Sequence, residues 1–153
     1  MLSKREQVLS ALFDQLRTIP LAVVKRNEAL PQAVPAAGLV ILRDGDPGEP
    51  DVTLNPVHLF FSHRAEIEAF VPQPAGGGGE ALLDALLGEI GAAFAADRSL
   101  GGLVENLFLG APTIESLVIE GGAPILVARI TVTIEYLTSD PLTAVLAAAT
   151  WLG

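Results

Sequence analysis

A long run of alternating residues near the C-terminal end constrains the fold more than any other feature. Successive side chains of a β-strand point to opposite faces of a sheet, so alternation over residues 123–137 predicts one strand with a buried and an exposed face. Helices or a second sheet must then cover the apolar face. The apolar positions are Ile130, Val132, Ile134 and Tyr136, and the polar positions are Arg129, Thr131, Thr133 and Glu135.

Two segments have the apolar spacing of amphipathic helices. Ser3 and Glu6 match a capping box, and we place the first helix at residues 3–17. The second helix is predicted from about 80 to 96. The stripes that define them are Val8, Leu9, Leu12, Phe13 and Leu16 in the first helix, and Leu83, Leu86, Leu87, Ile90 and Phe94 in the second.

Four more strands are predicted from apolar and β-branched runs between turn signals. Asp44-Gly45 and Gly121-Gly122 are the clearest turn signals, and the second predicts a hairpin with the long alternating strand. The alternation is interrupted near His63, which suggests a bend in the strand that contains it. The four strands are placed at residues 19–27, 38–43, 57–71 and 113–120.

The order of these elements, α-β-β-β-α-β-β, predicts one α+β domain over residues 1–153. We expect a mixed, mainly antiparallel sheet with two main helices packed on one face. Residues 72–79 contain two prolines and four glycines and are predicted to form a flexible loop. The stretch from about 140, rich in Ala and Leu, is interpreted as a short helix or a C-terminal arm against a neighbour.

The composition argues against several classes of function. A net charge of −9, from 18 acidic and 9 basic residues, disfavours tight binding to DNA phosphates. The absence of cysteine excludes disulfides and zinc sites built from cysteine. No uninterrupted apolar run reaches about 18 residues, so no membrane partner is expected. Half of the residues are hydrophobic, which is compatible with apolar surface covered by subunit contacts.

No group of residues has the spacing of a known catalytic or metal site, and we expect no cofactor. His58 and His63 would point to opposite faces of one strand, so we interpret them as surface or interface residues. The glycines at 76–79 lack the Lys-Ser/Thr of a phosphate loop. One loop is rich in carboxylates, and a solvated turn is favoured there over weak cation binding. Its acidic residues are Asp44, Asp46, Glu49 and Asp51.

The string from Asp97 to Gly102 combines a helix end with a glycine turn. With the order of elements, it resembles the tail-terminator (tail-completion, minor tail protein U-like) family of long-tailed bacteriophages. The resemblance covers nearly the whole chain. Its other motifs are the helix from Arg5 to Leu16, the strand end Lys25-Arg26-Asn27, the strand end Asp44-Gly45, and the final strand end Tyr136-Leu137-Thr138.

The resemblance implies a non-enzymatic virion protein that is made in the host cytoplasm and assembles at the head-proximal end of the tail. Such proteins form a hexameric ring that caps the tail tube and stops its polymerisation. The implied partners are further copies of the chain, the tail tube protein and the head–tail connector protein, while DNA passes without specific binding. The alternatives are another connector or stopper subunit, or a small stand-alone enzyme or ligand-binding domain.

Two segments and one arginine are the candidates for the interfaces of such a ring. The acidic loop of Asp44, Asp46, Glu49 and Asp51 is predicted to contact the tube or the connector. The same is predicted for the arm that contains Gln73, Gly76 and Gly79. Arg98 is predicted to pair with an acidic residue of the neighbouring subunit.

Overall fold

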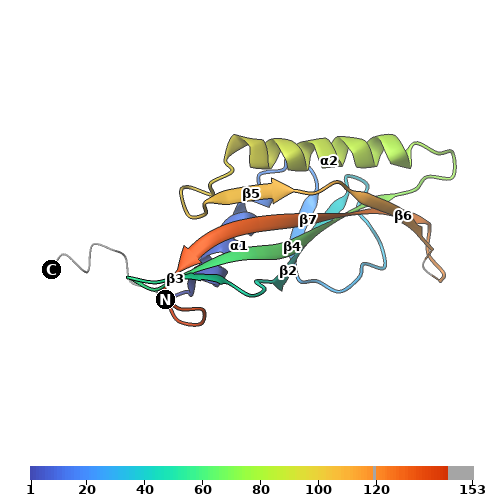
Figure 1. Cartoon of the computed structure of the whole chain (residues 1–153). Coiled ribbons are helices and arrows are strands. Elements are labelled where there is room, and N and C mark those ends of the chain that lie inside the picture. The colour runs from blue at the N-terminus through green and yellow to red at the C-terminus, as the bar shows by residue number, and fades with distance from the viewer. Residues whose placement is uncertain (119, 145–153) are drawn as a thin grey trace.

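A computed structural model of the chain describes residues 1–118 and 120–144. In this part of the chain two helices and seven strands follow in the order α-β-β-β-β-α-β-β-β. The predicted fold class is confirmed, because the strands form one mixed, mostly antiparallel sheet (Figure 1). The predicted order lacked two short strands, β3 (Asp51–Thr53) and β5 (Asn106–Leu109).

Both helices lie close to their predicted positions. Helix α1 spans Lys4–Leu16, and the Ser3 hydroxyl accepts a hydrogen bond from the Glu6 amide at 3.2 Å. Only this half of the capping box forms, because the Glu6 carboxylate binds Arg26 instead of the Ser3 amide. Helix α2 spans Gly79–Ala96.

The sheet is built around two long antiparallel strands, β4 (His58–Pro72) and β7 (Ile125–Thr138). The strand order is β1-β2-β4-β7-β5, with β3 paired to β4 and β6 paired to β7. Strands β1 and β2 are parallel, and the other pairs are antiparallel. The bounds of the other strands are β1 Val23–Arg26, β2 Leu39–Asp46 and β6 Thr113–Leu117.

The turn predicted at Asp44-Gly45 was wrong. Strand β2 continues through Asp44-Gly45 as a β-bulge, with a register shift between Arg43 and Asp46. Gly45 has φ +68°, and a Cβ there would lie 1.8 Å from the Arg64 carbonyl oxygen, so the glycine permits close approach of two strands. The single long strand predicted at 57–71 is confirmed: β4 pairs with β7 without a register shift, so no bulge interrupts it at His63.

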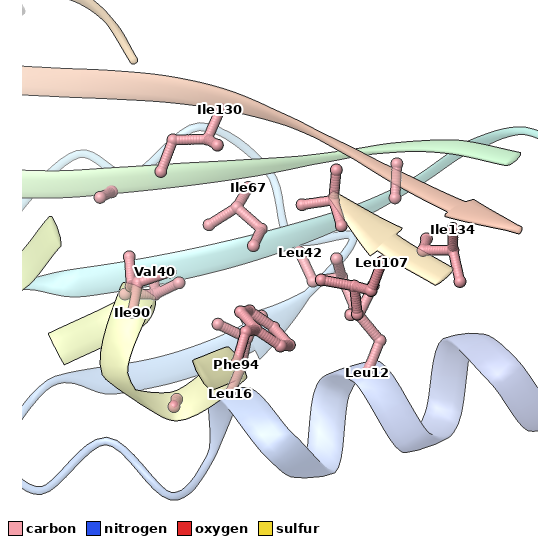
Figure 2. Packing of buried hydrophobic residues seen from close by; sticks show 14 of the residues in the cluster. Leu12, Leu16, Val40, Leu42, Ile67, Ile90, Phe94, Leu107, Ile130 and Ile134 are labelled. Atoms are coloured by element: carbon pink, nitrogen blue, oxygen red, sulfur yellow. The ribbon is translucent and has the colours of Figure 1, made fainter. Parts of the chain in front are cut away.

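The main core lies between the sheet and both helices. Odd-numbered residues of β4 and even-numbered residues of β7 face α1 and α2, as the alternation predicts. Figure 2 shows Leu12 of α1 and Phe94 of α2 directed toward the sheet residues Leu42 and Ile67. A smaller cluster around Phe70 covers part of the opposite face. Neither described helix is long and apolar enough to cross a membrane.

The predicted flexible loop and the predicted C-terminal arm differ in outcome. Within 72–79, the Gln73 side chain accepts a hydrogen bond from the Gly79 amide at 3.1 Å and so caps α2. Gly79 is buried as the first residue of that helix, so only the middle of the loop is exposed. At the C-terminal end, the Asp140 carboxylate accepts from the amides of Leu142 and Thr143. The rest of the predicted arm, 145–153, lies outside the described residues.

Candidate functional site

Exposed large apolar side chains gather on three parts of the surface. One part is the end of the sheet where β3 and the N-terminus lie, and it is called the end patch below (Figure 1). A second follows the outer edge formed by β5 and β6, and the third lies beside β1. The end patch contains Met1, Leu2, Val52, Leu54, Val57, Leu137 and Leu142, the β5–β6 edge contains Phe108, Ile114 and Val118, and the β1 side contains Leu21, Val23 and Leu30.

A cavity of about 280 Å³ opens within the end patch. Its wall combines α1, the loop after β2, β4, the end of β7 and the segment that follows β7. This end cavity is mostly apolar, but its wall contains a guanidinium, a carboxylate (Glu49) and two hydroxyl groups. The residues used below are Arg5, Leu59, Phe61, Tyr136, Thr138 and Leu142.

Arg5 is the only basic residue in the wall of the end cavity. It is half-buried, and it makes no ion pair or side-chain hydrogen bond with any residue that the structure describes. Its positive charge contributes to lowering the pKa of Glu6 and opposes the effect of burial on the pKa of Tyr136. Among the described residues the end cavity therefore presents a cation without an ion pair beside apolar side chains, with Glu49 at its rim, and the cation suits a carboxylate next to an apolar group.

A buried polar pair forms the floor beneath this cavity. The His63 Nε2–H donates to the Asp44 carbonyl oxygen at 2.5 Å, because a carbonyl can only accept. The Tyr136 hydroxyl then donates to His63 Nδ1 at 3.0 Å. Burial lowers the pKa of His63 and raises the pKa of Tyr136 to about 12, so both groups are neutral at pH 7.

The prediction that both histidines are surface or interface residues was wrong for His63, which is 1% exposed, whereas His58 is exposed. The sequence contained the signal for the correct placement. Position 63 has the same parity as the apolar residues Phe61 and Ala65, which share the buried face of β4.

An ion cluster fixes α1 to the sheet next to the end cavity. Arg26 of β1 donates to both Glu6 oxygens at 2.7 and 2.8 Å and to both Asp44 oxygens at 2.7 and 2.9 Å. These hydrogen bonds hold the pKa of Glu6 down at about 2 and also lower the pKa of Asp44. Asp44 therefore stabilises the fold, and its placement in an exposed interface loop was wrong.

The other acidic candidates are spread along one side of the end patch. Asp46 ends β2, and its carboxylate accepts from the Gly48 amide at 2.8 Å. Glu49 is exposed at the rim of the end cavity, and Asp51 is exposed at the start of β3. The structure therefore brings Glu49 next to the apolar end patch, where a partner could reach it, and separates it from Asp44.

The remaining candidates lie elsewhere. Arg98 is exposed and makes one long hydrogen bond, at 3.4 Å, to the Leu107 carbonyl. It lines a hollow beside Glu105 and Phe108 on the β5–β6 edge, so its predicted contact with a neighbouring subunit stays a prediction. Gly76 is exposed in the turn before α2, whereas Gln73 and Gly79 hold that turn against the helix.

The helix-free face of the sheet carries a row of alternating charges across four strands. Glu68 of β4, 6% exposed, accepts from Arg43 at 2.8 Å and from Arg129 at 3.2 Å. Arg129 also donates to Glu115 of β6. Because these charges neutralise one another, we interpret the row as cross-strand ion pairs that stabilise the sheet and not as a binding site.

No described group of three or more His, Asp or Glu side chains is arranged to hold a metal ion. All buried side-chain polar atoms in the described part of the chain have hydrogen-bond partners.

No model of a known protein family matches the chain, and no curated protein sequence matches it. The candidate site is therefore defined by surface chemistry: the end patch with its cavity, and the β5–β6 edge.

Proposed function

We propose that this protein is a structural ring subunit that caps the tail tube of a long-tailed bacteriophage and joins it to the head-side connector. The proposal starts from the sequence resemblance described above. It is supported by a surface with several separate apolar regions and by a fold whose polar clusters serve mainly to hold the elements together.

The observation that carries the proposal is that two of these regions differ in position and in the groups beside them. The end patch holds the cavity with Arg5 and Glu49, whereas the β5–β6 edge lies beside Arg98 and Glu105. A ring of identical subunits needs two different, complementary surfaces on each copy, because every contact is head-to-tail. Two unlike apolar surfaces suit that requirement.

The β5–β6 edge has a second property that suits subunit contacts. Both strands pair only with β7 among the described strands, so their outer backbone groups have no neighbouring strand. Such an edge is a template for contact with another chain. Phe108 and Ile114 add exposed apolar surface along it, on opposite faces of the sheet.

Light scattering coupled to size exclusion, followed by negative-stain images, tests the proposal. A ring of six copies of 15.9 kDa would have a mass of about 95 kDa. Purified tail tubes mixed with the protein should show capped ends and should stop growing. A ring that leaves tube ends uncovered would favour the alternative, another connector or stopper subunit.

A matched pair of variants separates assembly from general damage. Phe108→Asp places a charge on the β5–β6 edge and should abolish the ring, because Phe108 is 54% exposed there. Leu30→Asp makes the same change at a side chain that is 53% exposed beside β1, and it should retain the ring. Equal loss in both variants, or in neither, would argue against an interface at this edge.

A further inference from the structure

We propose that the end cavity binds the tip of the β6–β7 hairpin of a neighbouring copy, with Glu120 of that copy facing Arg5 and Val118 against the apolar wall. This inference rests on the proposed function, because it names one head-to-tail contact of the assembly. The hairpin tip is defined here by Val118, Glu120 and Gly121. It carries a carboxylate and a large apolar side chain, and the end cavity combines an apolar wall with the Arg5 guanidinium and, at its rim, Glu49.

The cavity has the chemistry of a receiving surface. The side chains of Leu59, Phe61 and Leu142 form its apolar part, and Arg5 contributes the one positive charge. Arg5 makes no ion pair with a described residue, so its guanidinium can donate charge-assisted hydrogen bonds to a carboxylate brought in by a partner. The apolar wall gains from an aliphatic side chain beside that carboxylate.

The hairpin tip has the complementary chemistry. Val118 is 79% exposed, and the Glu120 side chain is exposed two residues further on. Gly121 has φ +77°, a conformation that suits glycine in a tight turn, and the hairpin projects from the end of the sheet (Figure 1). A projecting turn with one large aliphatic group and one carboxylate suits insertion into a cavity.

The contact cannot form within one copy. Strand β7 spans Ile125–Thr138, with the hairpin before its first residue and the end cavity at its last residues. Fourteen residues at about 3.3 Å each separate the two by about 45 Å. Figure 1 shows the β6–β7 hairpin and the C-terminal end of β7 at opposite ends of the molecule. The hairpin tip can therefore reach only the end cavity of another copy, and the contact is head-to-tail.

Two other segments of the chain match the cavity less well. Residues 28–30 also combine an acidic and an apolar residue, but Leu30 is less exposed than Val118, and the Glu28 carbonyl is held by Arg43. Residues 141–153 contain no acidic side chain that could face Arg5. Glu28 therefore serves as the control position in the experiments below.

Charge reversal tests the pair directly. Arg5→Glu and Glu120→Arg should each weaken self-association by about thirtyfold or more, because each leaves two like charges facing one another at a partly buried contact. The double variant Arg5→Glu/Glu120→Arg should recover most of the affinity. Glu28→Arg should leave it unchanged. Sedimentation velocity over a range of concentrations measures the dissociation constants, and circular dichroism confirms that each variant folds.

Disulfide trapping provides a second readout, because the chain has no cysteine of its own. An Arg5→Cys copy mixed with a Glu120→Cys copy should form a covalent dimer under mild oxidation, whereas an Arg5→Cys copy mixed with a Glu28→Cys copy should not. If the free protein is monomeric, the same trapping is carried out on capped tail tubes.

The outcomes separate this inference from the proposed function. A ring that Arg5→Glu leaves intact, or equal trapping by both cysteine pairs, would overturn the contact while the proposed function stands. A wild-type chain that neither associates with itself nor caps tubes would remove both. Loss of association in the single variants without recovery in the double variant would show that Arg5 and Glu120 do not face each other.

Discussion

Replacing Arg26 by Met is the sharpest test of how this fold is held together. Arg26 forms four hydrogen bonds to two carboxylates, and these join α1, β1 and β2. Methionine keeps most of the aliphatic stem and removes the charge. The variant would leave the Glu6 and Asp44 carboxylates close together without a shared cation.

The pKa of Glu6 sets the magnitude. Its fall from 4.5 to about 2 corresponds to about 3.4 kcal/mol of interaction, at 1.36 kcal/mol for each pKa unit. The side chains of Glu6 and Asp44 are 33% and 34% exposed, so solvent screening reduces this figure by roughly half. Asp44 contributes in the same direction. We therefore expect Arg26→Met to lower the free energy of unfolding by about 2–3 kcal/mol at pH 7.

The pH dependence gives an independent check. The folded-state pKa of Glu6 is depressed, so its contribution is present above the unfolded value and is lost as pH falls through the folded value. The difference in unfolding free energy between wild type and Arg26→Met should therefore shrink between pH 4.5 and about 2. Urea unfolding followed by far-UV circular dichroism, at equal protein concentration, measures both quantities.

A control variant defines the refuting result. Arg17 makes a 3.7 Å pair with Asp14 in which the two side chains are 61% and 72% exposed. Arg17→Met should change the unfolding free energy by no more than about 0.5 kcal/mol, because exposed pairs are weak. Equal effects of Arg17→Met and Arg26→Met, or a difference that does not shrink in acid, would refute the reasoning.

Two further predictions concern the same region of the sheet. Gly45→Ala should destabilise the fold by about 3 kcal/mol or more, because its Cβ would overlap the Arg64 carbonyl oxygen. Gly48 has the same φ of +68° but open space around it, so Gly48→Ala should cost only about 1–2 kcal/mol. Urea unfolding of both variants measures the gap, and equal losses would contradict the close approach. Burial lowers the pKa of His63, so the free energy of unfolding should fall as pH drops below 6.5 and through the folded pKa. His63→Gln should flatten that slope between pH 6.5 and 5, and an unchanged slope would count against the buried neutral histidine.

The features that the sequence predicted correctly are the ones that local patterns encode. The stripe from Val8 to Leu16 placed α1 within one residue, because apolar spacing and a capping serine act within a few residues. The alternation around Val132 likewise identified β7 and its buried face. The turn at Gly121-Gly122 and the antiparallel β6–β7 pair were confirmed for the same reason.

The errors arose where a distant segment decides the structure. Asp44-Gly45 has the composition of a hairpin turn, but the close approach of Arg64 makes it a bulge within β2. Strands β3 and β5 are too short to be recognised without the long strands that pair with them. The interface candidates Asp44 and Gly79 were taken as exposed, because neither the ion pair with Arg26 nor the burial against Gln73 is visible in the local sequence.

The end cavity could not be predicted from any pattern, because its residues come from segments more than 100 positions apart. Arg5, Leu59 and Tyr136 meet only after α1 packs on the face formed by β4 and β7. A basic residue in the first turn of a helix is an ordinary surface feature in the sequence. Only the folded structure shows that Arg5 lines a cavity and makes no ion pair with a described residue.

The position of Arg5 links the stability of the fold to the proposed assembly. Arg5 precedes Glu6, and the Glu6–Arg26 hydrogen bonds fix this first turn of α1 against the sheet. The continuous pairing of β4 with β7 then holds the end cavity and the hairpin tip at a fixed distance and angle. In a head-to-tail assembly the angle between successive copies decides whether a ring closes or a filament grows. Loosening α1 should therefore disturb ring closure as well as stability, so that Arg26→Met impairs assembly more than Arg17→Met does.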